Sequence, residues 1–260
     1  MKIRVFSDIH NEIRRSMMGR RYTPWVPAIR KEDSETVLVL AGDIDHAKQV
    51  PEYLNSLSER FLAVIHVSGN HEYYGSNLTS VARALRESEL ADNVHCLQNS
   101  SVTIRGQKFI GSTMWTNLQG REWAVSRAMN DYRYIRLGTK GNYRKLNPGD
   151  TTYLHNEAVQ FIANNVDKDT IVVTHHSPLS PGNSSLGGFN PYGRQPSDVD
   201  YAYHACLENQ IIEEWKPKAW ISGHTHEAMD VEYFNTRLIV NCVGYLGEDS
   251  HYTEECFDVV

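Results

Sequence analysis

The chain has 260 residues, of which 40% are hydrophobic and 22% are charged, so it can bury the core of one α/β domain. Its formal net charge is −6, which disfavours long nucleic acid as a partner, because that function usually needs a basic face. No apolar stretch is long enough to span a bilayer, so we expect no membrane partner.

The four cysteines are scattered, with no CxxC spacing: Cys96, Cys206, Cys242 and Cys256. We interpret them as reduced thiols of a cytoplasmic protein, with one disulfide pair as the alternative. A strand-like run begins within two residues of the N-terminus, which leaves no room for a signal peptide. Without a repeat, a low-complexity run or a linker, residues 1–260 are expected to form a single domain. The sequence is silent on the oligomeric state.

Five short apolar runs are each followed directly by a polar cluster, and such runs are typical of strands covered on both faces. The runs are Lys2–Ser7, Thr36–Ala41, Phe61–Ser68, Thr170–Thr174 and Lys218–Ser222. The clusters are Asp8-Ile9-His10, Gly42-Asp43, Gly69-Asn70-His71-Glu72, His175-His176 and Gly223-His224-Thr225-His226. Because ligands bind beyond the carboxyl ends of strands in open α/β sheets, these clusters predict one shared site.

Helical patterns separate these strands, and a second group of strand-like runs is punctuated by turn residues. The expected helices are Tyr53–Arg60, Asn77–Leu90, Asp150–Asn164 and Tyr203–Trp215. The additional strands are Val102–Arg105, Lys108–Met114, Ala228–Tyr233 and Arg237–Cys242. Strands that alternate with helices, together with hairpin-like pairs, predict an α/β fold: a four-layer αββα sandwich of two mixed β-sheets flanked by helices.

The polar clusters supply carboxylate, amide and imidazole ligands in a proportion that suits two divalent metal ions. The candidate ligands are Asp8, His10, Asp43, Asn70, His175, His224 and His226. Asp8 and His10 alternate on a segment that we expect to be extended, so both would point the same way, and His224 and His226 repeat this spacing. These hard to borderline ligands suit Mn²⁺, Fe²⁺ or Fe³⁺, Zn²⁺ or Co²⁺ rather than Cu(I) or an iron–sulfur cluster.

The charge of such a site favours an anionic phosphate. Two divalent ions bring four positive charges, Asp8 and Asp43 remove two, and a bridging hydroxide removes another, which leaves roughly one net positive charge. A two-metal centre about 3.5–4 Å across can generate the hydroxide and hold the phosphoryl oxygens. His71, one residue past Asn70, is the candidate general acid for the leaving group.

The five clusters resemble the motifs of the calcineurin-like metallophosphoesterase superfamily, and the chain is similar within it to a set of small, mostly bacterial or phage-type enzymes. The shared phrases are GNHEYY (69–74), TMWTN (113–117), MNDYRYIR (129–136), VVTHHSP (172–178), WISGHTH (220–226) and a closing NxxGY (241–245). The resemblance covers nearly the whole chain. It implies a ββ-sandwich flanked by helices.

The resemblance also implies a role at each matching position. Asp8, His10 and His226 would hold the first metal; Asn70, His175 and His224 would hold the second; Asp43 would bridge them. His71 would lie outside the metal shell and protonate the leaving group or stabilise charge. His176 is the alternative to its neighbour His175 as the ligand.

Departures from the family pattern affect the expected substrate. Phosphoprotein phosphatases of the superfamily carry GDxxDRG and GNHExR, but here the first cluster continues Ile44-Asp45-His46 and the second continues Tyr73-Tyr74. The phosphate-clamping arginines are therefore absent from those places, which disfavours a protein phosphatase. Asp45 is a candidate acidic partner for His71, although its spacing differs by one residue.

Candidate substrate contacts are less well defined. We single out His176, Tyr73, Arg194 and Arg14. Arg14 lies in a polar stretch, and its alternative interpretation is a residue of a solvated loop. Residues 180–197 form a Gly-, Pro- and Ser-rich loop, in which Phe189, Tyr192 and Arg194 would contact substrate if it acts as a lid.

Other polar side chains have mainly structural interpretations. Asn130 and Asp131 are expected to be turn and capping residues. Among the histidines, His66 reads as a core residue, His155 and His251 as surface residues, and His204 as a possible lining residue of the site.

The sequence thus predicts a dinuclear metal-dependent phosphoesterase that hydrolyses a small phosphate ester, a phosphodiester or a nucleotide. The attack would come from a metal-bridging hydroxide, with His71 as general acid. The alternatives are a phosphomonoesterase or protein phosphatase, a nuclease, and a metal-binding scaffold without turnover.

Overall fold

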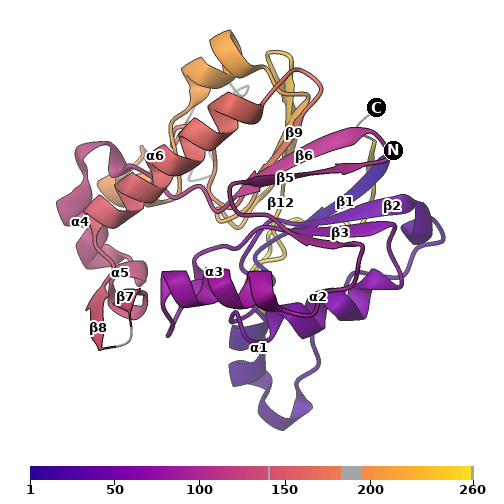
Figure 1. The fold of residues 1–260 in the computed structure, drawn as a ribbon, viewed down its shortest axis with the longest axis horizontal. Coiled ribbons are helices and arrows are strands. Elements are labelled where there is room, and N and C mark those ends of the chain that lie inside the picture. The colour runs from indigo at the N-terminus through magenta and orange to yellow at the C-terminus, as the bar shows by residue number, and fades with distance from the viewer. Residues whose placement is uncertain (140, 183–194, 259–260) are drawn as a thin grey trace.

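The computed structural model describes residues 1–139, 141–182 and 195–258, and two mixed β-sheets pack face to face at its centre (Figure 1). The first sheet has the strand order β13-β1-β2-β3-β4, and the second has the order β11-β12-β10-β9-β6-β5. A hairpin, β7-β8, stands apart from both. The strands are β1 Lys2–Phe6, β2 Thr36–Leu40, β3 Ala63–His66, β4 Val94–Cys96, β5 Ser100–Ile104, β6 Gln107–Ser112, β7 Arg136–Thr139, β8 Asn142–Lys145, β9 Ile171–Thr174, β10 Ala219–Ser222, β11 Ala228–Tyr233, β12 Thr236–Asn241 and β13 Phe257–Asp258.

Helices cover the outer faces of the two sheets, with α2 and α3 on the first and α6 on the second (Figure 1). The α-helices are α1 Asn11–Met18, α2 Val50–Ser58, α3 Leu78–Glu87, α4 Glu122–Ala128, α5 Asp131–Tyr134 and α6 Pro148–Asn165. Shorter helical turns are the 3-10 segments Gly19–Arg21, Asp33–Glu35, His71–Tyr73, Leu118–Gly120 and Asp198–Ala202, and the π-helical segment Gln210–Trp215. The predicted four-layer αββα sandwich is confirmed.

The alternation of side chains along each central strand produces the layers. In β2, Val37 and Val39 point into the core between the sheets, whereas Leu38 and Leu40 point toward the outer helices. Across the central layer they meet residues of the second sheet, including Phe109 of β6. Both faces of β2 are buried, which is why its sequence is continuously apolar.

The parallel strands of the two sheets end at the same edge, and this places the polar clusters together. β1, β2 and β3 are parallel neighbours in one sheet, as are β9 and β10 in the other. A bridge between Ser7 and Cys242 joins the sheets just beyond β1. The turns that leave these strands therefore face one another.

The predicted helix Tyr203–Trp215 is wrong in its first half. His204 forms a β-bridge with Ser177, and the N–H groups of Ala205 and Leu207 donate to the carbonyls of Ser177 and Pro178 at 2.8 and 2.7 Å. These pairings satisfy the backbone in place of helical bonds, so the apolar periodicity of the segment is realised only in its second half.

The positions predicted for several other polar side chains are corrected by the structure. His155 is buried rather than on the surface, with Nδ1 2.7 Å from the Trp115 carbonyl. His204 is buried against the Leu179 carbonyl at 3.0 Å. Arg14 lies on α1 rather than in a loop. His66 is in the core and His251 is exposed, as predicted.

We expect Phe109→Ala to lower the free energy of unfolding by about 3–5 kcal/mol, because its fully buried ring fills the space between the sheets. Urea unfolding of the metal-free protein measures this change. Tyr153→Ala is the matched control, since its side chain on α6 is 63% exposed, and it should change stability by less than about 0.5 kcal/mol. Equal effects of the two substitutions would contradict the assigned core.

Candidate metal centre

Five of the candidate ligands have a left-handed backbone conformation. Asp8 and His10 have φ of 53° and 51°, Asp43 has φ of 56°, and His224 and His226 have φ of 69° and 56°. The expected extended alternation is therefore wrong, although each pair still reaches the site. Such conformations cost of order 1–3 kcal/mol each for residues other than glycine, so the surrounding contacts must hold them.

Hydrogen bonds between the turns provide that support. The Asp8 N–H donates to the Gly42 carbonyl at 3.0 Å, and the His10 N–H donates to the Asp43 carbonyl at 2.9 Å. The Asp8 Oδ2 atom accepts the N–H of His224 at 2.9 Å, which ties the first sheet to the second. The same contacts that bend the turns thus fix the positions of the side chains.

Two glycines are required by close approach between the turns. A Cβ atom on Gly42 would lie 2.4 Å from His175 Nδ1, and one on Gly69 would lie 2.1 Å from Asp43 Oδ1. Both distances are far below van der Waals contact. The glycines of the second and third clusters therefore make room for the side chains of the site.

One group of ligand atoms gathers around Asp8, His10 and His226, with Asp43 beside it. The Asp8 Oδ1 atom lies 3.5 Å from His226 Nε2 and 3.9 Å from His10 Nε2. His10 Nε2 is also 3.9 Å from Asp43 Oδ2. These atoms are close enough together to bind one ion.

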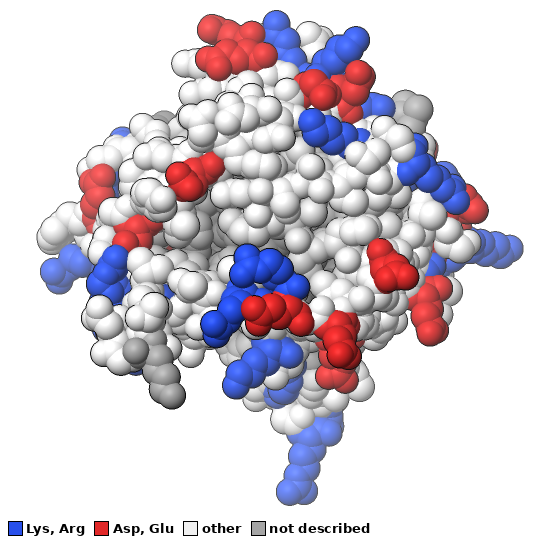
Figure 2. Space-filling view, in the orientation of Figure 1, with Lys and Arg blue, Asp and Glu red and all other residues white. Residues whose placement is uncertain are grey.

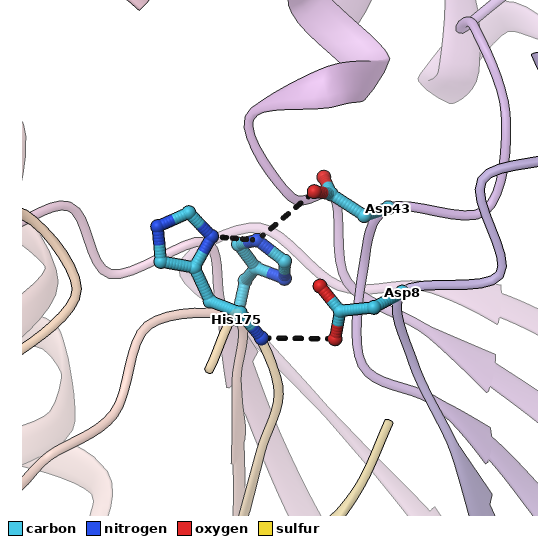
Figure 3. A group of neighbouring side chains, drawn as sticks. Asp8, Asp43 and His175 are labelled. Atoms are coloured by element: carbon cyan, nitrogen blue, oxygen red, sulfur yellow. Dashed lines mark hydrogen bonds and ion pairs between the residues drawn. The ribbon is translucent and has the colours of Figure 1, made fainter. Parts of the chain in front are cut away.

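A second group gathers around His175 on the other side of Asp43. His175 Nε2 lies 3.5 Å from Asp43 Oδ2, 3.0 Å from Asn70 Oδ1 and 2.9 Å from His224 Nδ1. Figure 3 shows the side chains of Asp8, Asp43 and His175 directed toward a common space. Since Asp43 Oδ2 is close to both groups, its position suits a bridging ligand.

The hydrogen bonds behind the imidazoles test whether cations fit here. His10 Nδ1 lies 3.1 Å from the Glu12 carboxylate, and His226 Nδ1 lies 2.7 Å from that of Glu248. These acceptors favour a proton on each Nδ1, so the Nε2 lone pairs of His10 and His226 face one another at 3.1 Å. That arrangement is repulsive unless a cation lies between them.

A buried atom without a partner supports the same conclusion. Asp8 Oδ1 is buried and makes no hydrogen bond with any described residue. A bare buried carboxylate oxygen is costly, and metal coordination removes that cost. The donor set of oxygens and imidazole nitrogens therefore fits two divalent metal ions, in the two groups described above.

The carboxylates and the imidazoles of the site have pKa values that are shifted by burial and by one another's charges. Burial raises the pKa of Asp8, but the charges of His226, His175 and His10 outweigh it and lower the pKa to about 2. Burial, with the nearby carboxylates of Glu72 and Asp8, raises the pKa of Asp43 well above its usual range. Burial lowers the pKa of His175, which favours the neutral form that coordination requires.

His71 lies at the rim of this cluster with an acidic partner that the sequence interpretation missed. Its Nδ1 is 2.9 Å from Glu12 Oε1, its Nε2 is 3.9 Å from Asp43 Oδ2, and its ring stacks on Tyr74 at a centroid distance of 4.2 Å. Asp45, the predicted partner, instead pairs with Arg15. The spacing of Glu12, two residues after His10, is the signal that could have identified it.

Asp131 has a role that turn propensity did not indicate. It is buried, and its Oδ1 accepts from Asn70 Nδ2 at 2.8 Å and from the Tyr74 hydroxyl at 2.7 Å. The first bond orients the Asn70 amide so that Oδ1 faces His175. Asp131 is thus more than the turn residue predicted.

Three of the predicted substrate contacts lie away from the cavity beside the metal ligands. Tyr73 and His176 are buried against Thr113, and the Arg14 guanidinium donates to the carbonyls of Ile9 and Gly244 at 2.7 and 3.0 Å. Each is held by structural contacts. Phe189, Tyr192 and Arg194, with most of the 180–197 loop, lie outside the described residues.

The cavity that contains the site has a volume of about 800 Å³. Tyr74, Tyr203 and Tyr245 contribute to its wall, and Met17 and Met129 add apolar surface. The Tyr245 ring centroid lies 4.5 Å from those of His10 and His226. Among the described lining residues there is neither lysine nor arginine, so histidines are the only groups there that can carry positive charge.

Comparison with known proteins shows which family and which solved structures the chain resembles. A family model described as calcineurin-like phosphoesterase matches residues 1–228. An uncharacterised protein, L509, of Acanthamoeba polyphaga mimivirus is 27% identical over 267 residues, which cover 96% of this chain and 93% of that protein.

Two crystal structures share the fold at low identity. Phosphopantetheinyl hydrolase of Mycobacterium tuberculosis has a TM-score of 0.64 and 15% identity, with 94% of this chain and 89% of that chain covered. A Staphylococcus aureus protein assigned as a 5′-nucleotidase, in complex with alpha-ketoglutarate, has a TM-score of 0.51 and 13% identity, with 92% and 48% covered.

We expect Asp131→Ala to weaken the binding of one metal ion about 10- to 100-fold, because the Asn70 amide loses the acceptor that orients it. Calorimetric titration of metal-free protein with Mn²⁺ measures this effect. Arg133→Ala, an exposed change on the same helix, should leave both affinities unchanged. Two unchanged sites in the Asp131 variant would exclude the orienting role.

Proposed function

The chain belongs to the calcineurin-like phosphoesterase family, and on that basis we propose that it is a dinuclear metal-dependent hydrolase of small phosphodiesters. The main support for this activity is that two groups of ligand atoms meet at Asp43 and that His71 lies beside them. We further propose that residues 1–260 act as a single metallophosphoesterase domain, because both sheets contribute ligands to one site.

In this proposal Asp8, His10 and His226 would hold one divalent ion, and Asn70, His175 and His224 would hold the other. Asp43 would be shared by the two groups. When bound, the ions supply Lewis-acid charge for the phosphoryl oxygens and an activated water as nucleophile. Mn²⁺, Fe²⁺ or Fe³⁺, Zn²⁺ and Co²⁺ all suit this donor set.

His71 acts on the leaving group. Glu12 accepts a hydrogen bond from Nδ1, so the proton available for transfer lies on Nε2, on the side of Asp43. Burial raises the pKa of Glu12, but hydrogen bonds from His10 and His71 outweigh this effect and lower it, so the carboxylate remains an acceptor for the His71 ring. Tyr74 fixes the plane of the ring by stacking.

The walls of the cavity support a diester as substrate. A monoester carries two negative charges near neutral pH, and the described wall offers no lysine or arginine to balance the second. A diester carries one, and the aromatic faces of Tyr74, Tyr203 and Tyr245 suit a nucleoside or another flat leaving group. The described acidic side chains Glu12 and Asp200 add to this preference.

A long nucleic acid is a less suitable partner than a small ester. Figure 2 shows Lys and Arg side chains interspersed with Asp and Glu on one face rather than gathered in a basic area.

No helix in residues 1–139, 141–182 and 195–258 is long and apolar enough to cross a membrane. The two structural neighbours, a phosphopantetheinyl hydrolase and a protein assigned as a 5′-nucleotidase, are named for phosphoester hydrolysis, which is consistent with the proposal.

We expect metal-loaded protein to hydrolyse bis(p-nitrophenyl) phosphate faster than p-nitrophenyl phosphate, and to lose both activities when a chelator removes the metal. Release of p-nitrophenolate with and without added Mn²⁺ measures this. A preference for the monoester would move the assignment to a phosphomonoesterase. No turnover with two ions bound would favour a metal-binding scaffold.

We expect His71→Ala to slow hydrolysis of a diester with a poor alcohol leaving group by about 100-fold or more, because the leaving oxygen loses its proton donor. The loss should be smaller for bis(p-nitrophenyl) phosphate, whose leaving group departs without protonation. His46→Ala is the matched control, since His46 lines the same cavity from an exposed position. Turnover within about twofold of the wild type on both esters would exclude His71 as the acid.

A further inference from the structure

A second cluster of titratable side chains lies outside the metal centre, at the edge of the first sheet. His66 of β3 and Cys96 of β4 are register partners in a parallel pair, so both side chains leave the same face of the sheet. The Glu72 Oε1 atom lies 3.5 Å from His66 Nε2. A thiol, an imidazole and a carboxylate are therefore neighbours.

The imidazole in this cluster is buried without a hydrogen bond. The His66 side chain has no exposed surface, and neither ring nitrogen makes a hydrogen bond with a described residue. Burial lowers the pKa of His66, but the Cys96 thiol and the Glu72 carboxylate outweigh this effect and raise the pKa to about 9. At neutral pH the ring is thus an imidazolium, a partner that favours the nucleophilic thiolate form of a cysteine.

A cavity of about 330 Å³ opens onto this pair. Leu85, Leu90 and Leu97 supply apolar walls, and the exposed Arg86 adds a positive charge. Cys96 is partly exposed and lines this space together with His66. None of the described residues that line this cavity lines the metal-site cavity.

The other cysteines have a different environment. Burial raises the pKa of Cys206, of Cys242 and of Cys256, which favours their unreactive thiol form. Because reactivity follows the thiolate, these three cysteines are expected to react slowly.

We propose that Cys96 is a thiol–disulfide exchange site that takes a small, carboxylate-bearing disulfide into this cavity. The Cys96 thiolate attacks one sulfur of the disulfide, and a new S–S bond forms to Cys96 while the original S–S bond breaks. The electron pair leaves with the second sulfur, which takes a proton from the His66 imidazolium. Cys96 is oxidised to a mixed disulfide, and one equivalent of small thiol is released. Arg86 pairs with a carboxylate of the incoming molecule.

Oxidised glutathione is the probe for this site. Full-length protein is incubated with graded concentrations at neutral pH, and peptide mass mapping follows the adduct on each of the four cysteines. We expect one glutathionyl group on Cys96 before the other three react, and no adduct at this stage in Cys96→Ser. Equal or faster labelling of Cys206 or Cys256 would overturn the proposal, and this comparison needs no variant.

Two pairs of variants separate the roles of the neighbours. His66→Gln should slow labelling of Cys96 about tenfold by removing the imidazolium, while His95→Gln, one residue from Cys96 and on the opposite face of β4, should not. Arg86→Gln should slow the reaction with oxidised glutathione about threefold but leave that with uncharged hydroxyethyl disulfide unchanged. If His66→Gln labels Cys96 at the wild-type rate, His66 does not activate the thiol. If Arg86→Gln slows both disulfides equally, Arg86 does not select a carboxylate.

Discussion

The Glu72 carboxylate is buried and accepts three backbone N–H groups, those of Asp43, Ile44 and Gly69, at 2.7 to 3.0 Å. These groups belong to the turns that leave β2 and β3. One side chain thus fixes two neighbouring turns in a single geometry, and a buried carboxylate that makes so many bonds is costly to displace. The hydrogen bonds of Glu72 thereby position the ligands Asp43 and Asn70, which lie in these turns.

The contact between the sheets depends on this arrangement. Once the turns after β1 and β2 are fixed, the Asp8 carboxylate can accept the His224 N–H from the opposite sheet. The tight passage of Gly223 beside Ser7, where a Cβ would lie 2.6 Å from the Ser7 hydroxyl oxygen, leaves no space for a side chain. Ligands separated by more than 200 residues are therefore brought within a few ångströms by this hydrogen bond and by the close packing of the turns.

The site itself is destabilising for the protein without metal. Left-handed backbone at Asp8, His10, His224 and His226, opposed imidazole lone pairs and a buried bare carboxylate oxygen all carry a cost. The apolar layer between the sheets, which includes Phe109, supplies the stability that offsets this cost. The residues that fold the protein and those that form the site are accordingly almost separate sets.

The sequence by itself determined the strands that carry the site and the types of ligand at their ends, because continuous apolar runs and abrupt polar clusters are local patterns. It also indicated the layered fold, since the alternation of Val37, Leu38, Val39 and Leu40 records which face each strand buries. Helices without a strong apolar stripe, such as α1 and α5, left no comparable signal.

Only the tertiary structure decided which side chains serve each ligand. Glu12 rather than Asp45 lies behind His71, and Asp131 orients Asn70 from 61 residues away. Tyr245 reaches His10 across the boundary between the sheets. The pairing of His66 with Cys96 likewise depends on strand register. Local sequence carries propensity and periodicity, whereas these contacts depend on where distant turns meet, and that is set by the packing of the two sheets.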